Sequence, residues 1–170
     1  KNYFYPDLPK GYQISQYRWP LSMGGWLMVN GKDGKEQKIR INRVHQEEDT
    51  GKLTHLPAGK AGAAGETLID YNRSGVPLVE IVTEPDFRDG ETVRDFAKKL
   101  QQIFRHLGVS NADMEKGDMR LEANVSVRPS GQSKLPDYRI ELKNINSFRF
   151  MVAAIEYEFK RQVDALGKGE

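Results

Sequence analysis

The stretch Val44-His45-Gln46-Glu47-Glu48-Asp49-Thr50-Gly51-Lys52 sets three acidic residues in a row at the end of a segment with strand-like alternation. A second stretch, Pro77-Leu78-Val79-Glu80-Ile81-Val82-Thr83-Glu84-Pro85-Asp86, places a carboxylate within an apolar run. A charge in mid-strand is costly to bury unless something pairs with it or coordinates it. Two carboxylates about 4 Å apart repel by roughly 4 kcal/mol at an effective dielectric near 20, and a divalent cation relieves that repulsion. The two stretches therefore predict a metal-nucleotide site built on strands, with Mg²⁺ as the ion.

The spacing of the acids in the second stretch separates two candidates. Glu80 and Glu84 share one face of the predicted strand 78–84, but lie about 13 Å apart at ~3.3 Å per residue. They cannot both bind one ion while the strand stays extended. Glu80, between Val79 and Ile81, is the better candidate, and Glu84 before Pro85 ends the strand.

Length and composition set limits on the class of protein. The chain has 170 residues, a net charge of +2 and no cysteine, which fits a reducing, cytoplasm-like compartment. No apolar run of about 18 residues and no signal-peptide pattern is present, so we expect no membrane span. The small net charge predicts that nucleic acid is bound through a local patch, if at all. The chain starts at Lys1 without methionine, and we expect a piece of a longer protein.

Hydrophobic periodicity predicts strands first, then helices around a hairpin. The predicted strands are 24–29, 38–45, 78–84, 119–128 and 138–143, with a turn at 30–34 and a bulge or strand end near Arg43. Predicted helices cover Asp89 to Leu107 and Phe148 to Leu166, capped by Asp89 and Ser147 and ended by Gly108 and Gly167. The apolar stripe of the second helix, expected to face the core, is Phe148, Met151, Val152, Ile155, Phe159, Val163 and Leu166. The order indicates an α+β fold, a mostly antiparallel sheet backed by helices.

The two last strands present a polar face. Its residues are Arg120, Glu122, Asn124, Ser126 and Arg128 on one strand and Arg139, Glu141 and Lys143 on the other. One interpretation is a ligand-binding surface. The alternative is a solvated face with cross-strand ion pairs of little energetic value.

Two loops are less regular. Residues 1–20 are aromatic, basic and interrupted by proline, so they either pack their rings on a core or stack a base and hold a phosphate. The glycine- and alanine-rich loop 53–66 is predicted to be mobile, with a lid as the weaker interpretation.

Several motifs in order resemble one family, the GatB subunits of the aspartyl/glutamyl-tRNA amidotransferases, from Lys1 to about Gly169. The motifs are Lys1 to Asp7 with Gly11 to Gln16, His45 to Lys52, Asn72 to Glu80, Glu84-Pro85-Asp86, Glu122 to Ser126, and Leu142 to Phe148. The resemblance implies a partial catalytic (cradle) domain over 1–170, similar to the glutamine synthetase/guanidino kinase fold.

The resemblance also implies an activity. The family uses ATP and Mg²⁺ to phosphorylate the side-chain carboxylate of Glu misacylated on tRNA(Gln), or of Asp on tRNA(Asn). Ammonia from the glutaminase subunit then displaces phosphate, and the A and C subunits of the amidotransferase are the expected protein partners. Phosphoryl transfer relies on positioning and charge neutralisation, with carboxylates on metal and cations on phosphate oxygens.

Roles for individual residues follow from the same resemblance. Glu48 and Glu80 match metal-binding, catalytic carboxylates, and Glu122 and Glu141 line the same sheet face. The expected nucleotide- and phosphate-binding residues are Arg120, Glu122, Asn124, Arg139, Glu141 and Lys143. The candidates for the tRNA 3′ end or the attacking carboxylate are Lys1, Tyr3 and Tyr5.

The family's upstream Gly-Leu-Glu-x-His segment and its C-terminal helical and tail domains have no counterpart in these residues. We therefore expect that the chain folds but does not transamidate alone. The alternative functions are a non-catalytic tRNA-binding module and a module that only assembles with the A and C subunits.

Overall fold

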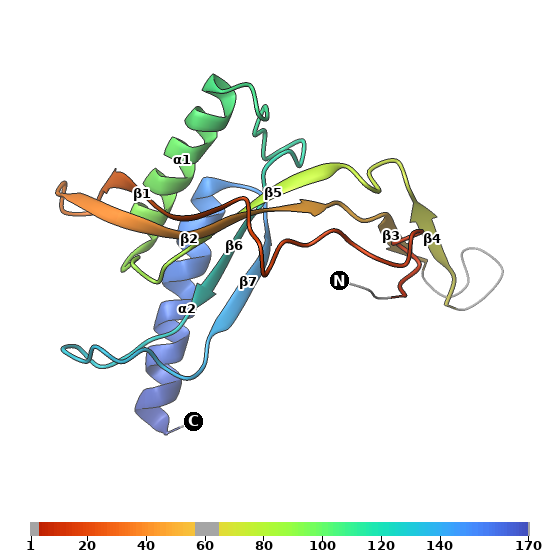
Figure 1. Cartoon of the computed structure of the whole chain (residues 1–170). Helices are drawn as coiled ribbons and strands as arrows, with labels where there is room; N and C mark the ends of the chain where they lie inside the picture. Colours follow the sequence, from red (N-terminus) through yellow and green to blue (C-terminus); the bar gives the residue numbers. More distant parts are fainter. Residues whose placement is uncertain (1–3, 57–64, 170) are drawn as a thin grey trace. The chain divides into compact units, whose positions relative to one another are not determined.

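The computed structural model describes residues 4–56 and 65–169 of the chain. It forms two compact units, Lys1–Trp26 with Arg40–Glu84 and Leu27–Ile39 with Pro85–Glu170. Its sheets contain antiparallel strand pairs and two long helices accompany them, so the predicted α+β class is confirmed (Figure 1). The core of the glycine- and alanine-rich loop, residues 57–64, lies outside the described residues.

The first unit is built on the end of strand β2. Strands β1 (Ser22–Asn30), β2 (Glu36–Glu48) and β5 (Pro77–Thr83) form a sheet in the order β1-β2-β5, in which β1 and β2 continue from one unit into the other. The register of β2 against β5 shifts between Ile41 and Arg43, as predicted for a bulge in this place. Strand β2 then continues to Glu48, so two of the three acids lie inside the strand and not after it. Strands β3 (Lys52–His55) and β4 (Thr67–Asp70) form a short hairpin.

Polar groups are buried where β2 ends. Asp49 is 7% exposed and pairs with Arg73 at 3.0 Å between Oδ2 and Nη2. The Asp49 N–H donates to the Val76 carbonyl, and the Asp49 carbonyl accepts from the Gly75 N–H. Both backbone groups of Asp49 are therefore hydrogen-bonded where the chain turns. Gly51 lies so close to Tyr71 and to the Asp7 and Asp70 carbonyls that a Cβ at this position meets atoms 3.1–3.3 Å away. Glycine is required here by close approach.

The second unit has an apolar core. Helix α1 (Gly90–His106) begins at the Asp89 cap, whose carboxylate accepts from the Thr92 N–H, and ends before Gly108 at φ 68°, both as predicted. Its Asp95 and Lys99 bind the backbone of Asn30 and Met28 at 2.8 Å each. The core contains Val29, Ile39, Phe96, Ala97, Leu100 and Met151. These contacts hold the β1–β2 turn against α1 within this unit.

A second hairpin packs on helix α2 (Phe148–Lys168). Strand β6 (Leu121–Val125) is shorter than the predicted strand 119–128. Strand β7 (Ile140–Ile145) begins and ends two residues later than the predicted strand 138–143. Both contact α2, which also contacts α1 (Figure 1). Ser147 caps α2 as predicted, but the helix continues through Gly167 and ends at Gly169, whose φ is 77°. Glycine at the left-handed position is what ends the helix.

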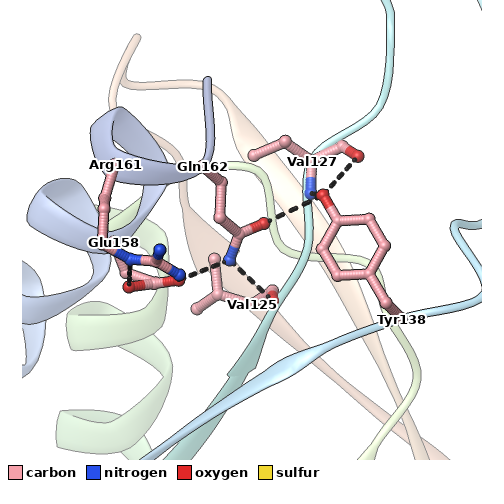
Figure 2. A network of polar contacts seen from close by, with 6 residues as sticks. All are labelled: Val125, Val127, Tyr138, Glu158, Arg161 and Gln162. Carbon is pink, nitrogen blue, oxygen red and sulfur yellow. Dashed lines mark hydrogen bonds and ion pairs between the residues drawn. The ribbon is translucent and has the colours of Figure 1, made fainter. Parts of the chain in front are cut away.

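The buried side of α2 differs from the prediction in its second half. Phe159, Val163 and Leu166 were expected in the core but are about half-exposed. Glu158 and Gln162 are buried instead, continuing the helical spacing that starts at Met151. Figure 2 shows why these polar groups are tolerated: Arg161 grips Glu158 with two N–H groups at 2.7 and 2.9 Å. Buried polar groups are stable when their hydrogen bonds are made.

Gln162 joins that helix to the hairpin strands. Its amide donates to Glu158 at 2.8 Å and to the Val125 carbonyl at 3.1 Å, and its oxygen lies 3.2 Å from the Tyr138 hydroxyl (Figure 2). The same hydroxyl accepts from the Val127 N–H at 3.4 Å. Tyr138 therefore belongs to this network and not to strand β7. The network fixes the end of β6 on α2.

Within the described residues, neither helix combines the length and the apolar character that a membrane span needs.

Candidate functional site

The antiparallel register of β2 and β5 brings three ligand-type side chains together. His45 lies directly opposite Glu80, and Glu47 follows two residues along on the same face. His45 Nε2 is 3.2 Å from Glu47 Oε1 and 3.2 Å from Glu80 Oε2. One ligand atom from each residue lies within 4.8 Å of the other two. We call His45, Glu47 and Glu80 the β2–β5 cluster.

Burial and like charge make the cluster electrostatically strained. The His45 side chain is 4% exposed, against 28% for Glu47 and 46% for Glu80. Partial burial, and then the charge of Glu47, raise the pKa of Glu80 above its ordinary value, although His45 and Arg43 act in the opposite direction. Two carboxylates at this separation repel by about 3–4 kcal/mol at an effective dielectric near 20. Within the part of the chain that the structure describes, His45 Nδ1 is buried with no hydrogen-bond partner.

This donor set fits a divalent cation. Carboxylate oxygens suit Mg²⁺ or Mn²⁺, and an imidazole nitrogen is compatible with the latter. A cation neutralises the repulsion between Glu47 and Glu80 that His45 relieves only in part. The cluster can therefore hold a metal ion through the two carboxylates, while the imidazole fixes their orientation.

Glu48 does not belong to this cluster, and its predicted role as a metal ligand together with Glu80 stays a prediction. It lies opposite Pro77 in the register, and successive residues of a strand point to opposite faces. Its two carboxylate oxygens each lie 2.7 Å from Lys10 Nζ, and one accepts from the Ile14 N–H at 3.1 Å. Hydrogen bonding to Lys10 and to that N–H lowers the pKa of Glu48. The structure groups Glu80 with Glu47.

The sequence contained a signal for the acid that lies beside Glu80. Strand parity from His45 reaches Glu47 and skips Glu48, so it depends on extending β2 through the acid run. We predicted a strand end near Arg43 to His45, which removed that parity argument. His45 was not singled out either, because nothing local shows which residue faces it across the sheet.

The hairpin of the second unit presents the predicted polar face. Asn124 lies opposite Glu141, and both side chains are exposed. Lys143 Nζ is 3.3 Å from Glu141 and 3.8 Å from Glu122. The hydrogen bond from Lys143 to Glu141, followed by the charge of Glu122, raises the pKa of Lys143. Glu122, Asn124, Glu141 and Lys143 thus share one face, as predicted, and all are open to solvent.

The arginines at this hairpin lie just outside the strands. Arg120 precedes β6 and, with Glu122, lines an open cavity of about 330 Å³ at the end of the hairpin. The other walls are formed by Met114, Gly117, Met119, Leu121, Asn144, Ile145 and Asn146. Arg139 is exposed and precedes β7. The cavity combines a cation, carboxylate and amide groups with methionine side chains.

The predicted substrate-contacting residues fall at the start of the chain. Lys1 and Tyr3 lie outside the described residues, and the Tyr5 side chain is 62% exposed. Tyr12, Tyr17 and Trp19 follow with exposed fractions of 46%, 74% and 84%. The rings of this segment are therefore mostly at the surface, which argues against the alternative in which they pack on a core.

The fold and the clustered residues define a class of α+β domains with an acid cluster on antiparallel strands and a second, polar sheet face on a helix-backed hairpin. Comparison with protein families gives the particular family. The model of the "GatB/GatE catalytic domain" matches residues 1–169, and the chain belongs to that family.

The similar curated proteins agree with this assignment. Three are named as the B subunit of an "Aspartyl/glutamyl-tRNA(Asn/Gln) amidotransferase", from Thermosipho melanesiensis, Thermotoga sp. (strain RQ2) and Trichormus variabilis. They are 55%, 53% and 48% identical to this chain, and each alignment covers all of it. The chain spans 34–35% of the length of these relatives. The resemblance stated from the motifs is confirmed.

Proposed function

We propose that the chain is the metal- and ATP-binding catalytic part of a tRNA-dependent amidotransferase. The observation that carries the proposal is the β2–β5 cluster, in which two carboxylates and an imidazole converge within 4.8 Å. Membership of a family described as a catalytic domain supports the same conclusion. The proposed substrates are ATP and Glu misacylated on tRNA(Gln) or Asp misacylated on tRNA(Asn), with the A and C subunits of the amidotransferase as partners.

The proposed reaction has two steps. The side-chain carboxylate of the misacylated residue attacks the γ-phosphorus of ATP, so that an acyl phosphate forms and ADP leaves. Ammonia from the glutaminase subunit then attacks the acyl carbon, phosphate leaves, and the amide remains. When bound, Mg²⁺ supplies neutralisation of the phosphate charge.

The chain's own residues have separate tasks in this scheme. Glu47 and Glu80 hold the ion, and the buried His45 orients both carboxylates. We assign Glu47 to this role in place of Glu48. Arg120, Arg139 and Lys143 bind phosphate oxygens, because cations are the usual partners of phosphate. Glu122 and Glu141 keep Lys143 in place. Together with Asn124 they accept hydrogen bonds from the nucleotide.

The first segment of the chain is proposed to contact the tRNA end. Lys1, Tyr3 and Tyr5 are the candidates, and Tyr5 is 62% exposed, as a residue that contacts a base must be in part. Because the chain spans about a third of its relatives, we propose that the remaining segments of such proteins are needed for transamidation.

Calorimetric titration with Mg²⁺-ATP tests the proposal. We expect binding to the wild-type chain and loss of binding in Glu47→Ala and Glu80→Ala, with Glu36→Ala as the matched control on the same strand as Glu47. The alternative of a non-catalytic tRNA-binding module predicts no nucleotide binding and an unchanged affinity for tRNA in all three variants. That result would overturn the catalytic assignment.

A further inference from the structure

The Glu48 carboxylate accepts three hydrogen bonds from a segment that lies more than 30 residues earlier in the chain. Lys10 Nζ is 2.7 Å from each carboxylate oxygen, and the Ile14 N–H donates to one of them at 3.1 Å. The Lys10 ammonium also lies 4.6 Å above the Tyr12 ring. The Glu48 side chain is 13% exposed, whereas that of Lys10 is 40% exposed. Both carboxylate oxygens are therefore engaged in contacts with this segment.

The same segment covers the backbone of β2 at its end. The Gln13 side chain donates to the Glu48 carbonyl at 2.6 Å, and Gln16 accepts from the Gln46 N–H at 2.8 Å. Between these two contacts, Ser15 forms an antiparallel bridge with Glu47. Residues 10–16 thus occupy the hydrogen-bonding groups of the β2 edge that β5 leaves open. A free strand edge would otherwise be mobile and exposed to solvent.

One peptide bond separates Glu48 from Glu47, but their side chains point to opposite faces. Glu47 faces His45 and Glu80, and Glu48 faces Lys10. Any rotation of the backbone at Glu48 therefore turns Glu47 away from the β2–β5 cluster. Supporting contacts of this kind keep ligands in place and typically change metal affinity 10- to 100-fold when they are removed.

We propose that Glu48 is a positioning residue. Its contacts with Lys10 and Ile14 hold residues 10–16 along the end of β2, and we call this arrangement the clamp. The clamp fixes the backbone that presents Glu47 to His45 and Glu80. This rests on the metal role given to that cluster above. The three acids in succession then have three different tasks. Glu47 is directed to the ion, Glu48 to the clamp and Asp49 to Arg73 in the following turn.

Substitution of Lys10 separates a positioning role from a ligand role by the sign of the effect. If Glu48 were a metal ligand, Lys10→Met would free its carboxylate and remove a competing positive charge, so cation binding would tighten. If Glu48 is part of the clamp, Lys10→Met releases the β2 end and binding weakens. Lys10→Arg keeps the charge and is the conservative control.

The experiment measures Mn²⁺ binding to the chain by electron paramagnetic resonance, with no nucleotide present. We expect about tenfold weaker binding in Lys10→Met and in Glu48→Ala, near wild-type binding in Lys10→Arg, and a smaller loss in Gln13→Ala. Unchanged or tighter binding in Lys10→Met overturns the proposal. Gln13→Ala keeps every charge and serves as the second test if a charge variant does not fold, because an unchanged affinity in it also counts against the clamp.

Two further measurements complete the test. Hydrogen exchange of the Ile14 amide is expected to accelerate in Glu48→Ala, because its acceptor is removed, and unchanged protection contradicts the clamp. Glu47→Gln and Glu80→Gln report on the cluster itself. If they leave Mn²⁺ binding unchanged, the metal site fails and the positioning role fails with it. If they abolish binding while Lys10→Met does not weaken it, only the positioning role is wrong.

Discussion

Glu80 on β5 and Glu158 on α2 are both acids in partly or fully buried surroundings, and their pKa values move in opposite directions. The hydrogen bonds from Arg161 lower the pKa of Glu158, with Gln162 assisting. Burial and the neighbouring Glu47 raise the pKa of Glu80. The Glu158 carboxylate accepts hydrogen bonds from Arg161 and Gln162 of its own helix. The Glu80 carboxylate faces the acid Glu47 and the imidazole of His45. The comparison teaches how to separate a structural acid from one that awaits a ligand.

The surroundings of the two acids also differ in what their neighbours can adjust. Around Glu158, every polar group of Gln162 has a partner, so the network is complete without any added group. Around Glu80, the His45 Nδ1 atom is buried without a hydrogen-bond partner among residues 4–56 and 65–169. A complete network contributes stability, whereas an incomplete one costs stability and is retained when it serves binding.

The largest expected effect is the loss of metal-dependent stabilisation when Glu80 is substituted. We predict that saturating Mn²⁺ raises the free energy of unfolding of the wild-type chain by about 2.7 kcal/mol at 100 times its dissociation constant. Glu80→Gln should abolish this gain, since one of two charged ligands is removed. Glu158→Gln is the matched control and should keep it. Urea unfolding with and without Mn²⁺ measures both, and an equal gain in Glu80→Gln would contradict the assignment.

The next effect concerns the completed network. Gln162→Ala leaves the Val125 carbonyl and the Tyr138 hydroxyl with fewer partners, and we predict a loss of about 1–3 kcal/mol in the free energy of unfolding. Lys160→Ala, an exposed position on the same helix, is the control and should change little. Equal stability of the two variants would show that the network is not a stabilising element.

A smaller effect follows from the direction of the Glu158 shift. Its pKa is lowered from 4.5, so the unfolded chain binds more protons than the folded one. The contribution of Glu158 is complete above pH 4.5 and is lost as the pH falls through its lowered value. We predict that acidification from neutral pH to about pH 3 destabilises the wild type more than Glu158→Gln. Urea unfolding at each pH measures the slope, and parallel slopes would refute the prediction.

The smallest effect on stability is expected at the hairpin face. Lys143 is exposed and its ion pairs with Glu141 and Glu122 are solvated, so Lys143→Ala should leave the unfolding midpoint nearly unchanged. Under the proposed function the same variant should weaken Mg²⁺-ATP binding. A large loss of stability with unchanged nucleotide binding would return this face to the alternative of a merely structural surface.

Much of the local structure was readable from the sequence. Asp89 and Ser147 cap the two helices because their side chains accept backbone N–H groups, and Gly108 follows α1 because it tolerates positive φ. The bulge near Arg43 and the polar face of the hairpin also came from periodicity. The caps and the glycine depend on a few neighbouring residues, and the bulge and the polar face were predicted from the alternation of side chains along a strand.

Other features depended on partners far along the chain. The buried face of α2 contains Glu158 and Gln162 and not Phe159 and Val163. The reason is that Gln162 forms hydrogen bonds on that side with the Tyr138 hydroxyl and the Val125 carbonyl. Hydrophobicity along the helix carries no information on those partners. In the same way, Glu47, Glu48 and Asp49 are almost identical in chemistry and adjacent in sequence, so composition alone does not show which of them lies beside Glu80.

The sequence by itself determined the α+β class, the helix boundaries at their first residues and an acid-rich site on β2 and β5. Only the tertiary structure decided which acid joins Glu80, because that depends on strand register and on a lysine 38 residues away from Glu48. The physical reason is parity: one residue along a strand reverses the face, and the register that sets the face is a property of two strands together.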